Sequence, residues 1–234
     1  MTADVQPSAK ARGPRSQTHR VVLVFSDIEG STPLWERAPE AMEASLDLHN
    51  ATLRGLIEEH EGYEVKTEDA AFMVAFESAQ DAVRFCLACQ EALHDLEWPE
   101  ALLENPEAAK SADGFFRGLR VRMGVHLGNT RKSADPTTGR MDFFGPVVSR
   151  AARIAGAAHG GQVVVSGRVF EKAGISDDEA VCIDLGEHRL KGLEQVDRFW
   201  QVLPARLSGR SFPPPRTLDP RRTNLPPEQK IEVE

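Results

Sequence analysis

The chain has 234 residues, of which 41% are hydrophobic and 27% charged, and its formal net charge is −8. This balance predicts one soluble globular domain with tails. The negative charge excludes a nucleic-acid backbone as the main partner, because such partners usually need a basic surface. There is no apolar run near 18 residues and no signal-peptide pattern, so the sequence predicts neither a membrane span nor secretion.

The three cysteines, Cys86, Cys89 and Cys182, are an odd and low count, which favours a reducing, cytoplasmic compartment. Cys86 and Cys89 form a CxxC pattern, but they lie inside an apolar helical repeat. No second Cys/His pair at metal-ligand spacing accompanies them. We therefore interpret them as buried helix cysteines.

The N-terminal third begins with a polar stretch, residues 1–19, which predicts a disordered leader. Residues 20–26 are a continuous apolar run, typical of a central strand that is buried on both faces. A polar turn with Gly30 follows, and a long helix is expected from Pro33, with Ser31 or Thr32 as its cap.

The middle of the chain predicts a hairpin and a second helix. Residues 62–67 and 71–76 have strand character and are joined by Glu68, Asp69 and Ala70. A helix is expected over residues 79–96. The Pro-, Glu- and Ala-rich residues 97–115 are typical of a surface insertion.

The last part of the domain alternates strands with one helix. The expected elements are a strand at 119–125, a hairpin arm at 126–143, a helix at 145–158 and strands at 162–166, 181–185 and 198–203. This order predicts an α+β fold, a ferredoxin-like βαββαβ sandwich with a C-terminal strand extension. The domain is expected to cover residues 20–204, and the proline-rich residues 205–234 a linker or tail.

One acidic residue stands out at the end of the first strand. The carboxylate of Asp27 could hold a divalent cation there, with the following turn receiving phosphate oxygens, or it could simply cap a helix. Taken alone, this position leaves both interpretations open.

Several segments, in this order, resemble the catalytic domain of class III nucleotidyl cyclases, the adenylyl and guanylyl cyclases. They are residues 25–32, 63–67, 72–76, 119–128, 142–145, 150–153 and 159–163. The resemblance covers about residues 20–204. It implies the class III cyclase fold and a reaction that converts a nucleoside triphosphate to a cyclic nucleotide and pyrophosphate.

The resemblance also implies a role for individual residues. In the family, two carboxylates hold two Mg²⁺ or Mn²⁺ ions. Asp27 matches the first carboxylate, and the backbone carbonyl of Ile28 would be a further metal ligand. The turn is expected to cradle phosphates, and its residues are Gly30, Ser31 and Thr32.

The base-recognition and transition-state positions follow in the same way. Lys66 and Asp142 match the base-selecting pair: a lysine donor suits adenine N1, and an aspartate acceptor suits the exocyclic amine, which points to ATP. Arg153 matches the arginine that stabilises charge on the α-phosphate.

Two positions depart from the family pattern. Ala70 stands where the second metal carboxylate is expected, and Asp69 lies one residue earlier, so that it could replace that carboxylate only if the turn reshapes. Ser149 stands where the family has the asparagine that orients the ribose, and its hydroxyl is shorter than an amide.

Three functional hypotheses follow from this degenerate site. The first is an adenylyl cyclase of impaired activity that makes cyclic AMP in intracellular signalling. The second is an inactive pseudo-cyclase that binds a nucleotide or dimerises as a regulatory module. The third is the metal-poor half of a heterodimer, since class III sites form between two subunits, and a homodimer would carry both defects in both sites.

Overall fold

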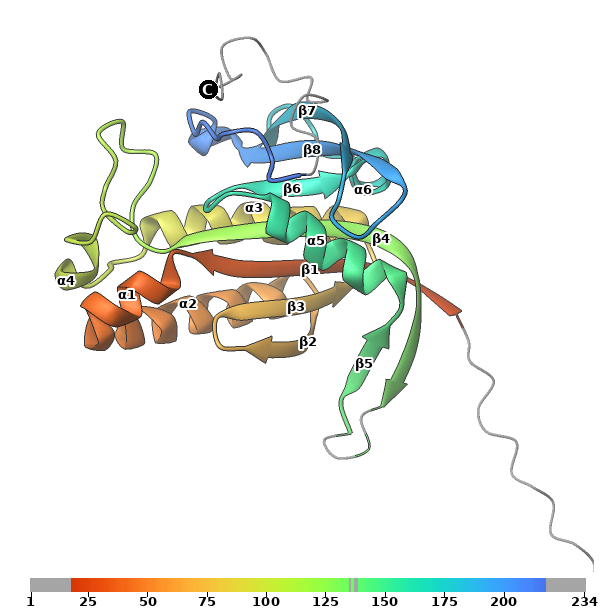
Figure 1. Cartoon of the computed structure of the whole chain (residues 1–234), viewed down its shortest axis with the longest axis horizontal. Coiled ribbons are helices and arrows are strands. Elements are labelled where there is room, and N and C mark those ends of the chain that lie inside the picture. The colour runs from red at the N-terminus through yellow and green to blue at the C-terminus, as the bar shows by residue number, and fades with distance from the viewer. Residues whose placement is uncertain (1–17, 135, 137–138, 218–234) are drawn as a thin grey trace, which may run out of the picture.

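The computed structural model describes residues 18–134, 136 and 139–217 (Figure 1). Its strands are β1 (Thr18–Glu29), β2 (Tyr63–Glu68), β3 (Ala71–Phe76), β4 (Arg120–Ala134), β5 (Met141–Phe144), β6 (Val163–Ser166), β7 (Ala180–Arg189) and β8 (Val196–Pro204). Its helices are α1 (Ser31–Arg37), α2 (Pro39–Glu59), α3 (Ala79–Asp95), α4 (Glu100–Leu103), α5 (Pro146–Ala157) and α6 (Gly167–Ala173), with a short 3₁₀ helix, η1 (Ala205–Leu207).

The strands form one sheet in the order β2-β3-β1-β4-β6-β8-β7. The long central strand β1 pairs antiparallel with β3 on one side and β4 on the other, while β4 pairs parallel with β6. β5 lies off this path and pairs with the far end of β4, so that the two form an arm beyond the sheet (Figure 1). The predicted α+β fold is confirmed.

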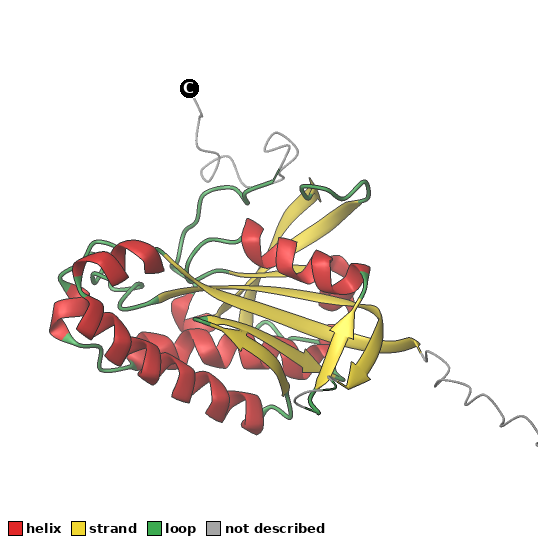
Figure 2. Cartoon of the chain, turned by 60° about the horizontal axis from the view of Figure 1, so that its bottom comes forward, coloured by secondary structure: helices red, strands yellow, loops and turns green. Residues whose placement is uncertain are grey.

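β1 is buried on both faces, as its unbroken apolar run predicts. Val22 and Val24 face the main core, which β1 shares with α2 and α3. Val21 and Leu23 face a smaller cluster on the opposite side, where α5 packs through Val147. The sheet therefore has helices on both faces (Figure 2), and α5, with the candidate residues Ser149 and Arg153, covers the face that the other helices leave free.

The structure corrects several expectations at this level. The helix expected from Pro33 is two helices with a break at Ala38, because Pro39 opens α2 and disfavours helical geometry in the residue before it. Neither Ser31 nor Thr32 caps α1. Gly30 holds that position in a left-handed conformation, φ 76°, with no side-chain cap. Helix α6 was not predicted.

The expected surface insertion, residues 97–115, is packed rather than loose. It contains α4 and buries Trp98 and Leu102 in the main core. The Trp98 ring nitrogen also donates to the carbonyl of Leu93, which ties the segment to the end of α3. Its polar composition reflects only its outer face.

The packed chain continues past the boundary predicted at Pro204. Leu207, Arg210 and Phe212 are buried, and the Arg216 backbone N–H donates to the carbonyl of Ala157 at 2.9 Å. The folded unit therefore includes residues 205–217, because burial of these side chains overrides the proline-rich composition. The rest of the predicted tail, and residues 1–17 of the predicted leader, lie outside the described residues. Within the described part of the chain, no helix has the length and apolarity that a bilayer crossing requires.

Candidate functional site

Asp27 stands near the C-terminal end of β1, directly opposite Arg122 on β4. The Arg122 Nε donates to Oδ2 of Asp27 at 3.0 Å, and Nη2 donates to the same oxygen. Both side chains are partly exposed. The next residue, Ile28, is buried in the main core, so that only its backbone carbonyl could serve a ligand. The carboxylate that the sequence singled out therefore has a cationic partner within the protein.

The β2–β3 turn holds the two residues considered for the second carboxylate position. Glu68 and Ala71 are paired, so Asp69 and Ala70 form a two-residue turn. Asp69 has a positive φ of 52°, a conformation that glycine adopts most easily, and its side chain is exposed. Ala70 is 7% exposed and packs in the main core. The turn thus keeps its two-residue geometry and offers a methyl group where the resemblance expects a carboxylate.

The residues present do not fit a two-metal centre. The first carboxylate is held by a guanidinium, and the second position is Ala70. Among the residues that the structure describes, no group of three or more His, Cys, Asp or Glu side chains lies close enough together to hold a metal ion. A pair of divalent cations needs several oxygen ligands, which this arrangement lacks.

The two residues of the predicted base-selecting pair lie together. The Lys66 Nζ on β2 is 4.0 Å from Oδ2 of Asp142 on β5. Phe143 donates its backbone N–H to the other oxygen, Oδ1, at 2.8 Å, which fixes the orientation of the carboxylate. Both side chains remain partly exposed. A cation and an anion from two separate segments are therefore presented side by side.

Lys66 also lines a cavity of about 340 Å³, within the size range of small-molecule sites. Ser149, on the first half of α5, lines the same cavity. The remaining lining residues are mostly apolar: Phe25, Glu68, Ala71, Phe72, Met73, Val148 and Ala152. A flat aromatic ring could lie against such walls, with Lys66 at the edge.

Arg153 lies one helical turn after Ser149 and does not line this cavity. Its side chain is exposed, and Nη1 donates to the carbonyl of Lys191 in the β7–β8 loop. Asp27 and Asp69 do not line the cavity either. The structure therefore places Lys66 beside Asp142 and, with Ser149, at one cavity, whose lining does not include Asp27, Asp69 or Arg153.

Two residues near these positions escaped the sequence reasoning. Arg122 lies on the polar side of an alternating strand, and only the β1–β4 register reveals that it faces Asp27. Glu29 ends β1, and it accepts hydrogen bonds from Arg216 and from the backbone of Gly160. Burial raises the pKa of Glu29, but these two hydrogen bonds and the charges of Arg216 and His159 together hold it below its ordinary value.

The family model described as the adenylate and guanylate cyclase catalytic domain matches residues 14–202. The adenylate cyclase of Schizosaccharomyces pombe is 36% identical over 215 residues, which cover 81% of this chain and 13% of that protein. The adenylate cyclase of Neurospora crassa is 37% identical over 230 residues, 83% of this chain and 10% of that protein. The chain thus spans about a tenth of the length of these relatives.

Solved structures give the same result. Two structures of Trypanosoma brucei adenylate cyclases in their monomeric state have TM-scores of 0.75 and 0.77, at 28% and 29% identity. The matches cover 84% and 86% of this chain, and 92% and 95% of those chains.

Proposed function

Because the chain belongs to the family of adenylate and guanylate cyclase catalytic domains, we propose that it binds ATP and forms little or no cyclic AMP by itself. It is an adenylate cyclase-like catalytic domain in which the base-binding side is complete and the metal side is not. In cellular signalling, such a domain would sense or sequester ATP rather than convert it efficiently to cyclic AMP.

The single observation that carries this proposal is the 4.0 Å approach of Lys66 to Asp142 beside a cavity of small-molecule size. An ammonium group is a donor only, and a carboxylate is an acceptor only. Adenine offers the matching pattern, an acceptor at N1 next to a donor at the exocyclic amine. Guanine offers the reverse pattern, so the pair favours ATP over GTP.

The phosphate side has its own candidates. Arg153 is exposed, and a guanidinium has five N–H donors, so that its hydrogen bond to Lys191 leaves donors for an α-phosphate. Gly30 turns the chain sharply from β1 into α1, and Ser31 and Thr32 follow it as the proposed phosphate-cradling turn. Ser149 lies beside the cavity, but its hydroxyl reaches less far toward a ribose than an asparagine amide would.

Slow conversion of ATP to cyclic AMP is expected because the metal-binding side of the site is incomplete. Mg²⁺ or Mn²⁺ would supply charge neutralisation and hydroxyl activation in a class III site. In this chain Ala70 cannot ligate a cation, and Asp27 would first have to leave Arg122. A homodimer would repeat both shortcomings in each of its two sites.

A second candidate function is a heterodimer half. The contrast between an assembled base pair and an incomplete carboxylate pair favours it, since a partner with two metal carboxylates could complete one shared site. Lys66, Asp142 and Arg153 would then come from this chain. Ser149 would still weaken ribose orientation at that site.

Equilibrium titration with ATP and GTP tests the proposed function. We expect the chain to bind ATP more tightly than GTP, and Lys66→Ala to weaken ATP binding. Lys172→Ala is the matched control, because Lys172 is an exposed lysine of α6, outside the pair and the β4–β5 arm. An unaltered chain that binds neither nucleotide would refute the proposal.

A further inference from the structure

We propose that Tyr63 is a positioning residue, which holds the β4–β5 arm against β2 and thereby sets the distance between Lys66 and Asp142. This inference rests on the proposed function, because it concerns the selectivity of the same base-reading pair. Tyr63 itself contacts no part of the proposed nucleotide site, and it acts through the backbone of β5.

Three contacts join β2 to β5 and to the residue that precedes it, and they lie close to one another in both segments. The Tyr63 hydroxyl oxygen accepts a hydrogen bond from the backbone N–H of Met141 at 2.9 Å. Arg140 donates to the carbonyl of Glu64. Lys66 then meets Asp142. The base-reading pair is thus one of three neighbouring links between the two segments.

No backbone ladder supports this junction within the described strands. β5 has its ladder with β4, from Arg131↔Phe144 to Ala134↔Met141, while β2 has its ladder with β3. The arm is therefore a two-stranded ribbon beyond the sheet (Figure 1), and such ribbons have little stability of their own. Side-chain contacts decide where its end lies relative to β2.

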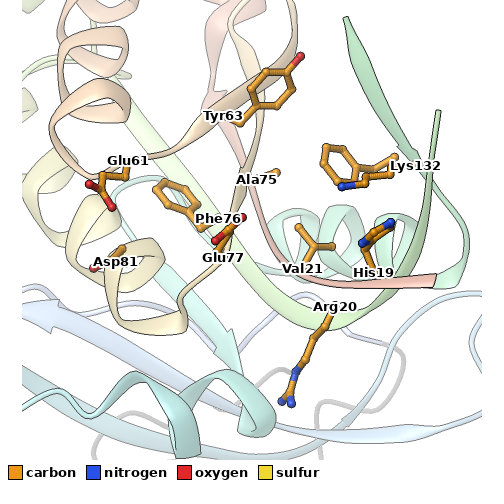
Figure 3. A pocket seen from close by; sticks show the side chains of 11 residues that line it. His19, Arg20, Val21, Glu61, Tyr63, Ala75, Phe76, Glu77, Asp81 and Lys132 are labelled. Atoms are coloured by element: carbon orange, nitrogen blue, oxygen red, sulfur yellow. The ribbon is translucent and has the colours of Figure 1, made fainter. Parts of the chain in front are cut away.

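A hollow beneath the arm makes these contacts more important. A cavity of about 580 Å³ separates part of the arm from the sheet, and its lining includes His19, Val21, Tyr63, Lys132 and Phe143. Figure 3 shows Tyr63 and Lys132 extending from different strands on two sides of this space. Core packing does not fill this volume, and Phe143 is the residue of β5 that packs, partly buried, against the smaller core cluster. The links from β2 therefore add to a limited apolar contact.

At the junction, β2 is held by contacts to the rest of the domain. We therefore expect the arm, and not β2, to move when a contact between them is lost. Glu64 accepts from the Arg54 Nε at 3.1 Å and from the Thr67 hydroxyl at 2.7 Å. Arg54 lies in α2, so β2 is linked to the body of the domain. If the Tyr63 hydroxyl is lost, the movement is expected in β5, and Asp142 moves with it.

Tyr63→Phe tests the inference, because it removes only the hydroxyl from a side chain that is 40% exposed. A hydrogen bond of this kind corresponds to about a threefold to tenfold change in an equilibrium constant. We expect ATP affinity to fall within this range and the ATP-to-GTP preference to fall with it. Ser176→Ala is the control, since it removes a hydroxyl that donates to Glu179 at 2.8 Å between α6 and β7, outside the arm and β2.

The ratio of the ATP and GTP affinities distinguishes a positioning role of Tyr63 from a general loosening of the site, because loosening would weaken the binding of both nucleotides equally. If the unaltered chain binds ATP and Tyr63→Phe retains its affinity and preference, the inference is wrong while the proposed function stands. If the unaltered chain binds no nucleotide, the proposed function itself fails.

A spectroscopic measurement provides an independent check. Tyr63 is the only tyrosine of the chain, so incorporation of 3-fluorotyrosine gives one ¹⁹F resonance. ATP should shift this resonance in the unaltered chain, and should leave it in place when Asp142→Ala removes the link to the base. Saturating ATP that leaves the resonance of the unaltered chain unmoved would contradict the role of Tyr63.

Discussion

Asp27 and Arg122 are directly opposed across the β1–β4 ladder, and the Arg122 guanidinium donates twice to one oxygen of the Asp27 carboxylate. The carboxylate that resembles the first metal ligand of a cyclase is thus compensated by a cation of the same domain. Ala70, which matches the second metal position expected from the resemblance, is buried in the main core.

This relationship predicts how the chain responds to a divalent cation without nucleotide. A ligand that binds only the folded state raises the melting temperature, and a chain without a site shows no rise. We expect Mn²⁺ alone to leave the melting temperature of the unaltered chain unchanged. Ala70→Asp should gain a Mn²⁺-dependent rise, and replacing Asp27 by Asn in that variant should remove it. A Mn²⁺-dependent rise in the unaltered chain would show that the metal side is competent.

Glycine substitutions test how α5 is seated on the sheet. A Cβ at Gly124 would lie 2.1 Å from the backbone nitrogen of Ala155 in α5. Gly124→Ala should therefore displace the helix that carries Ser149 and lower the free energy of unfolding by about 3 kcal/mol. Gly156→Ala is the matched control: its Cβ meets nothing within 4 Å, and it should stabilise the helix by about 0.5–1 kcal/mol. Urea unfolding of both variants measures the difference, and equal effects would refute this packing.

The segment after β8 should contribute to stability through Arg210. Its guanidinium is buried against neutral acceptors, with Nη1 2.7 Å from Oε1 of Gln90 and 3.0 Å from the carbonyl of Gly161, and Nε 2.9 Å from the carbonyl of Phe115. Burial lowers the pKa of Arg210 to about 10. Arg210→Met would leave three buried acceptors unpaired, and should lower the free energy of unfolding by about 3 kcal/mol.

Arg206 provides the contrast in the same segment. It forms exposed ion pairs with Glu91 and Asp95, which are worth less than about 1 kcal/mol. Arg206→Met should therefore have little effect on the urea midpoint. Equal midpoints for the two arginine variants would indicate that residues 205–217 do not stabilise the domain.

Two buried histidines predict a pH dependence of stability. Burial lowers the pKa of His49 and of His126 from 6.5 to about 4. Between pH 6.5 and 4 the unfolded chain binds more protons at these positions than the folded chain, so stability falls as the pH falls through this window. From pH 7 to pH 5 the loss should reach up to about 2 kcal/mol per histidine. Urea unfolding at both pH values checks this, and His49→Leu should reduce the slope; an unchanged slope would contradict it.

The order of elements was largely predictable from local patterns. The alternation of Val121, Met123 and Val125 and the spacing of the β2–β3 hairpin carry their own signals, and the structure agrees with both. The boundary at Pro204 and the single helix from Pro33 were wrong. The composition of a segment reflects how its residues interact with solvent. Long-range contacts, such as those of Arg210, decide whether the segment packs against the domain.

In the candidate site, too, some residues could be identified from the sequence, whereas other contacts are visible only in the fold. The sequence identified Lys66 and Asp142 through resemblance, and the structure brings them together. The Asp27–Arg122 pair and the Tyr63 link depend on strand register and on the course of an arm, which no local pattern encodes. Whether Asp69 could replace the carboxylate expected at Ala70 depends on the turn, in which Asp69 is exposed with a positive φ and Ala70 is buried.

Cyclic AMP formation from ATP and Mn²⁺ tests the central claim most directly. The unaltered chain is compared with a variant that combines Asp69→Gly, Ala70→Asp and Ser149→Asn, with a melting curve for each. We expect little or no cyclic AMP from the unaltered chain and clear formation by the variant, because the second carboxylate and the ribose-orienting amide are restored. Rapid cyclic AMP formation by the unaltered chain, abolished by Asp69→Ala, would show that Asp69 serves as the missing ligand and that the domain is a working cyclase.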